Sequence, residues 1–84
     1  MPERDVKVTN EVGLHARPAA EFAKKAATFS CEVIVVKDGD EANGKSILSV
    51  LKLDVRKGDT ITLRTESDGA DDALTEIVDF VESL

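Results

Sequence analysis

The spacing of apolar residues switches between two and about 3.6 along this chain, and this pattern limits the fold more than any other feature. Residues 5–9 and 60–65 alternate apolar and polar side chains, and residues 32–37 contain a β-branched run. Each of these segments is predicted to form a strand. Residues 16–29 carry an alanine-rich apolar stripe at helical spacing, and a second such stripe starts near Ala70. Strands and helices therefore alternate.

Two shorter segments complete the predicted order. Asp38 and Gly39 are turn formers, so residues 41–43 are predicted to return as a short edge strand. Ser46 is suited to cap a brief helix that carries Ile47, Val50 and Leu51. The order is then β-α-β-β-α-β-α, and the tight turn implies antiparallel pairing. We expect an α+β open-faced sandwich, in which helices cover one face of one sheet.

Length and composition narrow the class of protein. The chain has 84 residues, which leads us to expect one domain over residues 1–84. A net charge of −6 and only three aromatic side chains, all Phe, argue against a nucleic-acid partner. No apolar run approaches the ~20 residues of a membrane span. A charged N-terminus and the single Cys31 favour a cytoplasmic protein.

The single histidine has a specific setting, at the start of the first predicted helix. Pro18 falls in the first turn, where its missing N–H costs little. The amides of Ala16, Arg17 and Ala19 are then expected to be free donors at the positive end of the helix dipole. Arg17 adds a guanidinium whose shape suits phosphate oxygens. The segment predicts an anion site beside His15.

Imidazole can carry a phosphoryl group reversibly, because a neutral ring nitrogen attacks phosphorus and later leaves readily. A histidine that merely caps the helix, or lies exposed without a role, is the alternative. A metal site is not expected, because one His and one Cys fall short of a zinc set. The pattern also predicts no paired acid and base near His15, so partners are expected to supply the remaining chemistry. We therefore expect a carrier and not an enzyme.

The segment GLHARPAAEF, residues 13–22, closely resembles the active-site motif of the HPr family, the histidine-containing phosphocarriers of the sugar phosphotransferase system. GKSILSVLKL, residues 44–53, resembles the second motif of that family. The resemblance implies a four-stranded antiparallel sheet with three helices and no cofactor. It also implies that Nδ1 of His15 accepts phosphate from Enzyme I. A histidine of an Enzyme IIA component would then receive it.

Residues 39–46 also satisfy the pattern G-x-x-x-x-G-K-[ST] of a nucleotide-binding P-loop. We reject that reading because Asp38, Asp40 and Glu41 would place acids beside the bound phosphates. Ser46 is instead interpreted as a helix cap. The family resemblance implies that an HPr kinase/phosphorylase could phosphorylate this serine as a regulatory switch.

A docking surface for transient partners is predicted around the second motif. Its apolar part would comprise Phe22, Ile47, Leu48 and Leu51. The surrounding cations would be Arg17, Lys24, Lys25, Lys45 and Lys52. With transient docking as the mode of action, we expect the chain itself to be a monomer.

Two residues depart from the family pattern. Val12 stands where several relatives carry a hydroxyl residue, and Asp54 stands where glycine is common, which puts the predicted turn there in question. The presence of His15 argues against the catabolite-repression homologue, which the resemblance implies would lack it. A carrier of the nitrogen-related phosphotransferase branch and a pure interaction module acting through the Ser46 helix remain alternatives.

Overall fold

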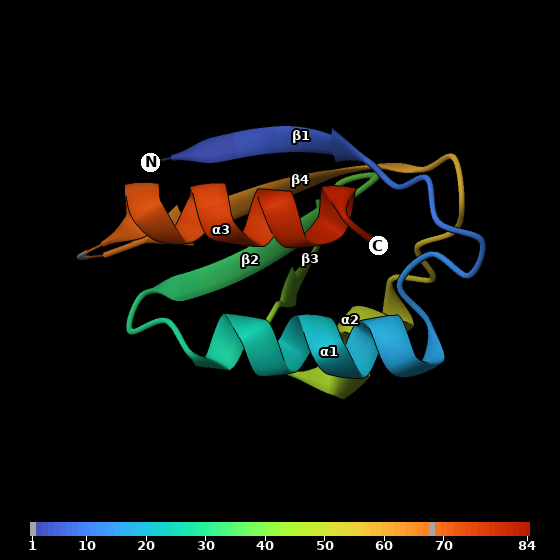
Figure 1. Cartoon of the computed structure of the whole chain (residues 1–84), viewed down its shortest axis with the longest axis horizontal. Helices are drawn as coiled ribbons and strands as arrows, with labels where there is room; N and C mark the ends of the chain where they lie inside the picture. The colour runs from blue at the N-terminus through green and yellow to red at the C-terminus, as the bar shows by residue number, and fades with distance from the viewer. Residues whose placement is uncertain (1, 68) are drawn as a thin grey trace.

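The computed structural model describes residues 2–67 and 69–84. The predicted element order β-α-β-β-α-β-α is confirmed (Figure 1). In chain order the elements are β1 (Glu3–Lys7), α1 (Ala16–Ala27), β2 (Glu32–Lys37), β3 (Asp40–Asn43), α2 (Ile47–Lys52), β4 (Thr60–Glu66) and α3 (Ala70–Glu82).

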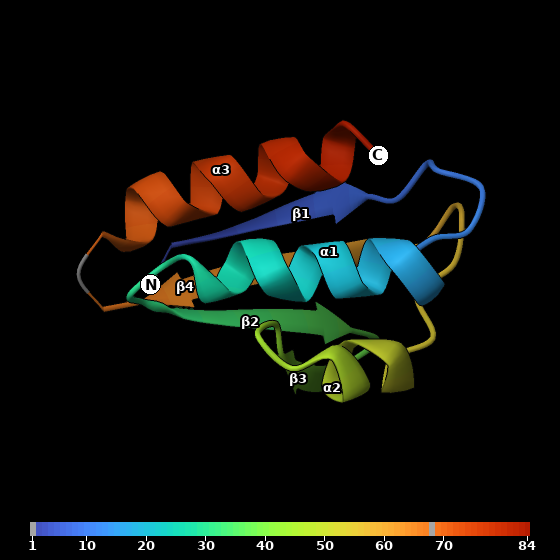
Figure 2. The same ribbon diagram turned by 60° about the horizontal axis from the view of Figure 1, so that its bottom comes forward.

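The four strands form one antiparallel sheet in the order β1-β4-β2-β3. The three helices lie on one side of it: α3 lies over β1 and β4, α1 lies beside α3, and α2 lies beside α1 near β3 (Figures 1 and 2). This arrangement confirms the expected α+β open-faced sandwich, with one sheet face covered and the other open.

Some boundaries differ from the sequence prediction. β1 spans Glu3–Lys7 and not residues 5–9, because Val8 leaves the ladder: its amide donates to the Asp59 carbonyl at 2.8 Å, and its carbonyl accepts from the Gly58 amide at 2.7 Å. The first helix stops at Ala27, two residues earlier than predicted. The next residue, Thr28, turns its hydroxyl back to the Lys25 carbonyl at 2.7 Å and ends the helix.

The core lies between the covered sheet face and the helices. Ile61 and Leu63 of β4 point inward, as the alternation in residues 60–65 predicted, and are fully buried. Val33 and Val35 of β2 are buried beside them. α1 contributes mainly alanines, which allows the helix to lie close to the sheet. The inward residues predicted for α3 are all buried; they are Ala73, Leu74, Ile77, Val78 and Val81. The core therefore anchors both long helices.

The turn between β2 and β3 matches its sequence prediction. Asp38 and Gly39 have φ values of 52° and 85°, the left-handed conformations of a two-residue hairpin, and Lys37 pairs with Asp40. The first part of the segment that matches the P-loop pattern therefore forms a β-hairpin instead of a phosphate-binding loop. After β3 the amide of Gly44 donates to the Val33 carbonyl at 2.7 Å and is not free for a phosphate.

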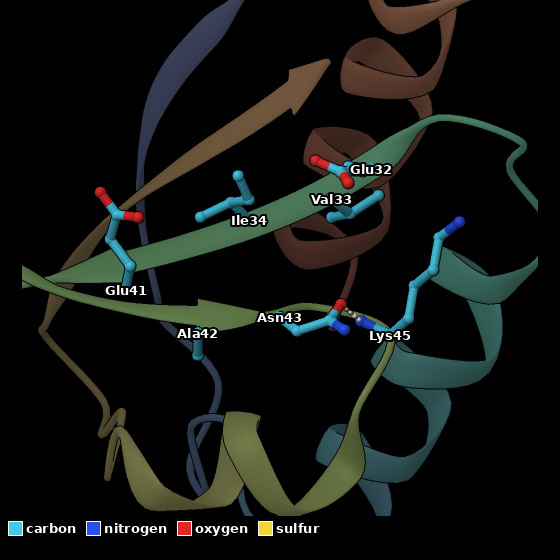
Figure 3. A pocket seen from close by; sticks show the side chains of 7 residues that line it. All are labelled: Glu32, Val33, Ile34, Glu41, Ala42, Asn43 and Lys45. Atoms are coloured by element: carbon cyan, nitrogen blue, oxygen red, sulfur yellow. Dashed lines mark hydrogen bonds between the residues drawn. The ribbon is translucent and has the colours of Figure 1, made fainter. Parts of the chain in front are cut away.

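An open hollow of ≈ 390 Å³ lies along this hairpin (Figure 3). Glu32 and Glu41 line it together with Lys45, so its charge disfavours a nucleotide phosphate. The amide of Lys45 donates to Asn43 Oδ1 at 3.0 Å. A second amide that a P-loop would offer to the phosphate is therefore already hydrogen-bonded. The structure agrees with the rejection of a P-loop.

Candidate functional site

His15 occupies the N-cap position of α1, where the sequence predicted it. Its backbone is extended, with φ −119° and ψ 161°, and its side chain makes no capping hydrogen bond. The preceding residue, Leu14, is fully buried and fixes this point of the chain to the core. The imidazole itself is 36% exposed. A buried anchor thus holds an accessible ring at the start of the first helix.

Gly13 brings a second loop against this ring. It has a φ of +61°, and a Cβ atom at this position would overlap the Val55 carbonyl oxygen. That carbonyl accepts a hydrogen bond of 3.0 Å from the Leu14 amide. The loop before α1 therefore lies directly on the loop that joins α2 to β4, and only glycine permits the approach.

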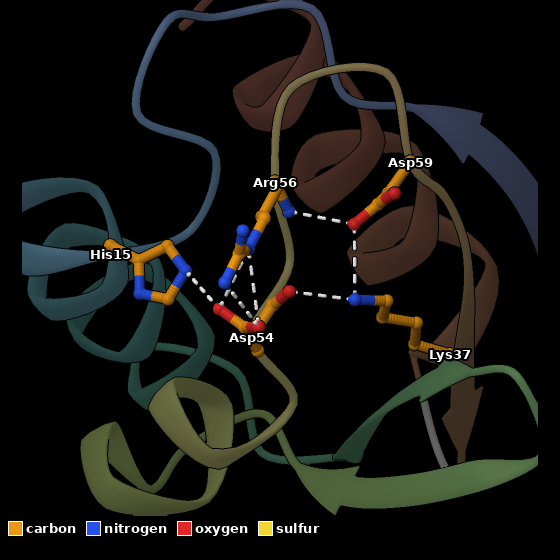
Figure 4. Close-up of polar contacts among 5 residues, drawn as sticks. All are labelled: His15, Lys37, Asp54, Arg56 and Asp59. Atoms are coloured by element: carbon orange, nitrogen blue, oxygen red, sulfur yellow. Dashed lines mark hydrogen bonds and ion pairs between the residues drawn. The ribbon is translucent and has the colours of Figure 1, made fainter.

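Asp54 is the residue that this contact places beside the histidine. Its Oδ1 lies 2.9 Å from Nε2 of His15 (Figure 4). The expectation that His15 has no paired acid beside it is therefore wrong. Asp54 has a φ of +53°, so the position requires the left-handed conformation that glycine favours and aspartate tolerates. The turn predicted from the family pattern is kept despite the change of residue.

A network of polar contacts holds the Asp54 loop in place (Figure 4). Arg56 donates from Nε to both Asp54 carboxylate oxygens, at 3.2 and 3.1 Å, and its Nη2 lies 3.0 Å from Oδ2. Lys37 Nζ reaches across from β2 and donates to the Asp54 carbonyl at 2.6 Å. The Arg56 hydrogen bond is the largest cause that holds the pKa of Asp54 below its usual 3.8, so this carboxyl group stays ionised.

The first helical residue, Ala16, has a φ of +51°, which is strained for a residue with a side chain. The sharp entry into α1 is made there, and Ala16 is exposed although the predicted apolar stripe included it. Ala16 and Arg17 are the first residues of the helix, so their amides have no partner four residues earlier inside it. The predicted amide donors thus lie directly after His15.

The structure places Arg17 in the exposed first turn of α1. Within residues 2–67 and 69–84, no ion pair of its guanidinium is found. The lysines predicted to surround the docking surface differ in their exposure and contacts. Lys24 and Lys52 are exposed, Lys25 lies 3.7 Å from Glu76, and Lys45 donates to the Phe29 carbonyl at 2.8 Å. Lys45 thus links the loop before α2 to the segment that follows α1.

The predicted apolar docking patch is only partly at the surface. Ile47 and Leu48 are 45% and 72% exposed, but Leu51 is partly buried against the core. Phe22 is fully buried and packs edge-on against Phe80 with ring centroids 6.3 Å apart. The prediction that Phe22 contributes to a docking surface is therefore wrong. Its helical position places it on the core face of α1.

Ser46 caps α2 as predicted: its Oγ accepts a hydrogen bond of 3.3 Å from the Ser49 amide. It is half-buried and immediately precedes the exposed pair Ile47 and Leu48. A negative group added at Ser46 would therefore lie at a helix start and beside exposed apolar side chains.

In the part of the chain that the structure describes, no group of three or more His, Cys, Asp or Glu side chains is arranged to hold a metal ion. None of the helices in this part of the chain combines the length and hydrophobicity needed to cross a bilayer.

The fold and this site define a small α+β protein with an accessible histidine at the start of a helix. The family model described as "PTS HPr component phosphorylation site" matches residues 2–83. The chain belongs to the HPr family, the phosphocarrier proteins of the phosphotransferase system.

Relatives of two kinds resemble the chain along its length. HPr-like protein Crh of Halalkalibacterium halodurans is 40% identical over 82 residues, covering 98% of both chains. Phosphocarrier protein HPr of Vibrio cholerae is 36% identical over 84 residues, covering 100% of this chain and 99% of the relative. The family is therefore certain, while carrier and regulatory members both lie among the relatives.

Solved structures of HPr-family proteins have the same fold as this chain. HPr-C-His of Thermoanaerobacter tengcongensis superposes with a TM-score of 0.95 at 40% identity, over 99% of this chain and 93% of that one. Crh of Bacillus subtilis, described as a dimer with a swapped domain, superposes with a TM-score of 0.80 at 35% identity, over 99% and 95%.

Proposed function

We propose that this chain is a phosphoryl carrier of the phosphotransferase system that accepts phosphate on His15 and donates it to another protein. The observation that carries the proposal is the accessible imidazole at the N-cap of α1, next to the first amides of the helix and the exposed Arg17. Crh relatives leave a regulatory protein as the rival. The single histidine, at the position of the family's phosphate acceptor, favours the carrier.

The surroundings of His15 suit a phosphate that must be given away. A phosphoryl group on the ring adds roughly two negative charges. The helix start and a solvent-exposed guanidinium each stabilise such charge by only about 0.3–1 kcal/mol at the surface. The phosphate is then held weakly enough to pass on. The hollow that His15 lines with Asp54 and Arg56 is open to solvent. We infer that a partner completes the site, so that the protein acts as a stoichiometric carrier between enzymes.

The proposed partners are Enzyme I as donor and an Enzyme IIA component as acceptor. Incubation with Enzyme I and labelled phosphoenolpyruvate should charge the protein, and addition of Enzyme IIA should discharge it. His15→Ala should abolish both steps while the amide spectrum keeps its native dispersion. Transfer that survives in His15→Ala would contradict the proposal. Charging by the Enzyme I of the nitrogen-related branch alone would assign the protein to that branch.

Ser46 supports a second, regulatory role for the same domain. Phosphoserine at the start of α2 is compatible with the helix, because negative charge suits that end of its dipole. It would also place roughly two negative charges beside the exposed Ile47 and Leu48, where an apolar partner surface would dock. A dedicated kinase/phosphorylase is the proposed agent. Incubation with such a kinase and ATP should phosphorylate the wild type and leave Ser46→Ala unlabelled.

We propose that residues 1–84 act as one domain and as a monomer. The described helices and strands share one core, which a single carrier domain requires. Because one related structure is described as a swapped dimer, the oligomeric state needs its own measurement. Sedimentation equilibrium should give the monomer mass across the concentration range of the transfer assays.

A further inference from the structure

We propose that Asp54 is a positioning residue for His15: it holds the ring proton on Nε2 and thereby makes Nδ1 the nitrogen that attacks phosphorus. This inference rests on the proposed carrier function. Its basis is the distance of 2.9 Å between Asp54 Oδ1 and His15 Nε2.

The donor and acceptor roles in this contact follow from the chemistry of the two groups. An ionised carboxylate attracts an N–H group and repels a nitrogen lone pair, so at 2.9 Å from Oδ1 we infer that Nε2 carries the ring proton. In the neutral ring the lone pair is then on Nδ1. Figure 4 shows the second ring nitrogen pointing away from Asp54 and Arg56. The nucleophilic nitrogen is therefore free of the Asp54 network.

Asp54 is itself held firmly, which a positioning role requires. Its carbonyl accepts from Lys37 and its carboxylate accepts from Arg56, so contacts from two directions fix both its backbone and its side chain. Its left-handed φ of +53° turns the chain at this point. An exposed aspartate without these contacts would lose the alignment to side-chain motion.

The proposed step balances without net proton movement. The Nδ1 lone pair of His15 attacks the phosphorus of the donor phosphohistidine and forms the new N–P bond. The donor N–P bond breaks, and its electron pair stays on the donor nitrogen. Nε2 keeps its proton throughout, while the ring of His15 gains positive character as the bond forms. The Asp54 carboxylate, 2.9 Å from Nε2, stabilises that charge electrostatically.

The carboxylate also repels the incoming phosphate, and this repulsion opposes its stabilisation of the positive ring. Oδ1 faces Nε2–H, and Arg56 contacts both carboxylate oxygens, which offsets much of the negative charge. The phosphate attaches to Nδ1, the ring nitrogen that points away from Asp54 (Figure 4). The contact between the carboxylate and Nε2 is direct, while the repulsion acts over a longer distance and is partly neutralised, so the net effect favours transfer.

Two substitutions test the proposal without disturbing the backbone. Asp54→Gly removes the acceptor and suits the left-handed φ, while Asp54→Asn keeps an acceptor oxygen, loses the charge and tolerates the same φ. Asp79→Asn on α3 serves as the charge-matched control, because Asp79 is exposed. The first readout is the ¹⁵N spectrum of His15 in its neutral form, recorded on the unphosphorylated protein.

We expect the wild type and Asp79→Asn to show a protected Nε2–H proton and an unprotonated Nδ1. Asp54→Gly should lose that protection, and Asp54→Asn should retain part of it. The single-turnover rate of phosphorylation by charged Enzyme I should fall roughly tenfold in Asp54→Gly and less in Asp54→Asn, as expected for a half-exposed hydrogen bond to a charged group.

An unprotonated Nε2 in the wild type, or equal spectra and rates for wild type and Asp54→Gly, would overturn the role of Asp54. The outcomes separate this inference from the carrier function. If His15→Ala abolishes phosphorylation while Asp54→Gly behaves as wild type, the carrier stands and the positioning role fails. If the wild type is never phosphorylated, the carrier fails, whereas the nitrogen spectra still decide whether Asp54 fixes the ring proton.

Discussion

Lys37 on β2 lies 3.0 Å from Asp59, at the far end of the loop that faces His15. Asp59 Oδ2 also accepts a hydrogen bond of 2.8 Å from the Arg56 amide. The sheet thereby holds both ends of the loop, since the same lysine donates to the Asp54 carbonyl. A charge pair at the end of β2 thus supports the geometry beside the functional histidine.

The Asp59 pair predicts how stability depends on pH. The Arg56 amide and then Lys37 hold the pKa of Asp59 below its usual 3.8. A depressed pKa contributes stability that is fully present above 3.8 and is lost as pH falls through the folded-state value. Asp59→Asn should therefore lower the urea midpoint at pH 7 and approach the wild type in acid. A difference that stays constant across this range would contradict the assignment.

Arg17→Ala is expected to slow phosphoryl transfer by about two- to fivefold, because an exposed guanidinium stabilises the added phosphoryl charge by about 0.3–1 kcal/mol. The stability should change little, since Arg17 is exposed. Lys24→Ala, on the same helix and also exposed, is the matched control. Rapid-quench assays with Enzyme I measure the rates. Equal effects of the two substitutions would show general electrostatic attraction in place of a specific phosphate contact.

Leu48→Asp should weaken docking to Enzyme I and Enzyme IIA by about tenfold or more, because it would bury an unpaired negative charge in an apolar contact. Leu48 is 72% exposed, so the fold should tolerate the change. Ile34→Asp, on the open sheet face away from α2, provides the comparison. Titration calorimetry with each partner measures affinity. Unchanged binding in Leu48→Asp would exclude the start of α2 from the docking surface.

Ser46→Ala should destabilise the protein by about 1 kcal/mol, the usual cost of losing an N-cap, measurable by urea unfolding. Ser46→Asp should preserve the fold but weaken partner binding, because it places negative charge beside Ile47 and Leu48. Amide spectra and calorimetry separate the two effects. A broad change in the spectrum of Ser46→Asp would indicate a conformational switch and contradict the electrostatic explanation.

Much of the fold could be predicted because local patterns and tertiary burial agree here. The alternation around Ile61 and Leu63 identified β4, and the Asp38–Gly39 turn gave the hairpin and the direction of pairing. His15 and Ser46 were placed at helix starts because capping depends on nearby residues. These are short-range effects, which a sequence records directly.

What the sequence did not reveal depends on contacts between distant segments. Asp54 lies far from His15 along the chain, and they meet only because Gly13 allows two loops to touch. The unusual residue at position 54 was visible, but its partner was not. Phe22 was wrongly assigned because an aromatic residue on an amphipathic helix can belong to the core or to a docking surface. The sequence does not distinguish the two. The positive φ of Ala16 could not be predicted, because an alanine in the sequence does not indicate a left-handed conformation.

Mapping the phosphorylated residue tests the central claim most directly. The protein is charged with Enzyme I and phosphoenolpyruvate, digested at alkaline pH and sequenced by mass spectrometry. We predict one acid-labile phosphoryl group, on His15, which disappears when Enzyme IIA is added before digestion. A phosphoryl group on another residue, or none on His15 when a known HPr is charged under the same conditions, would contradict the carrier function.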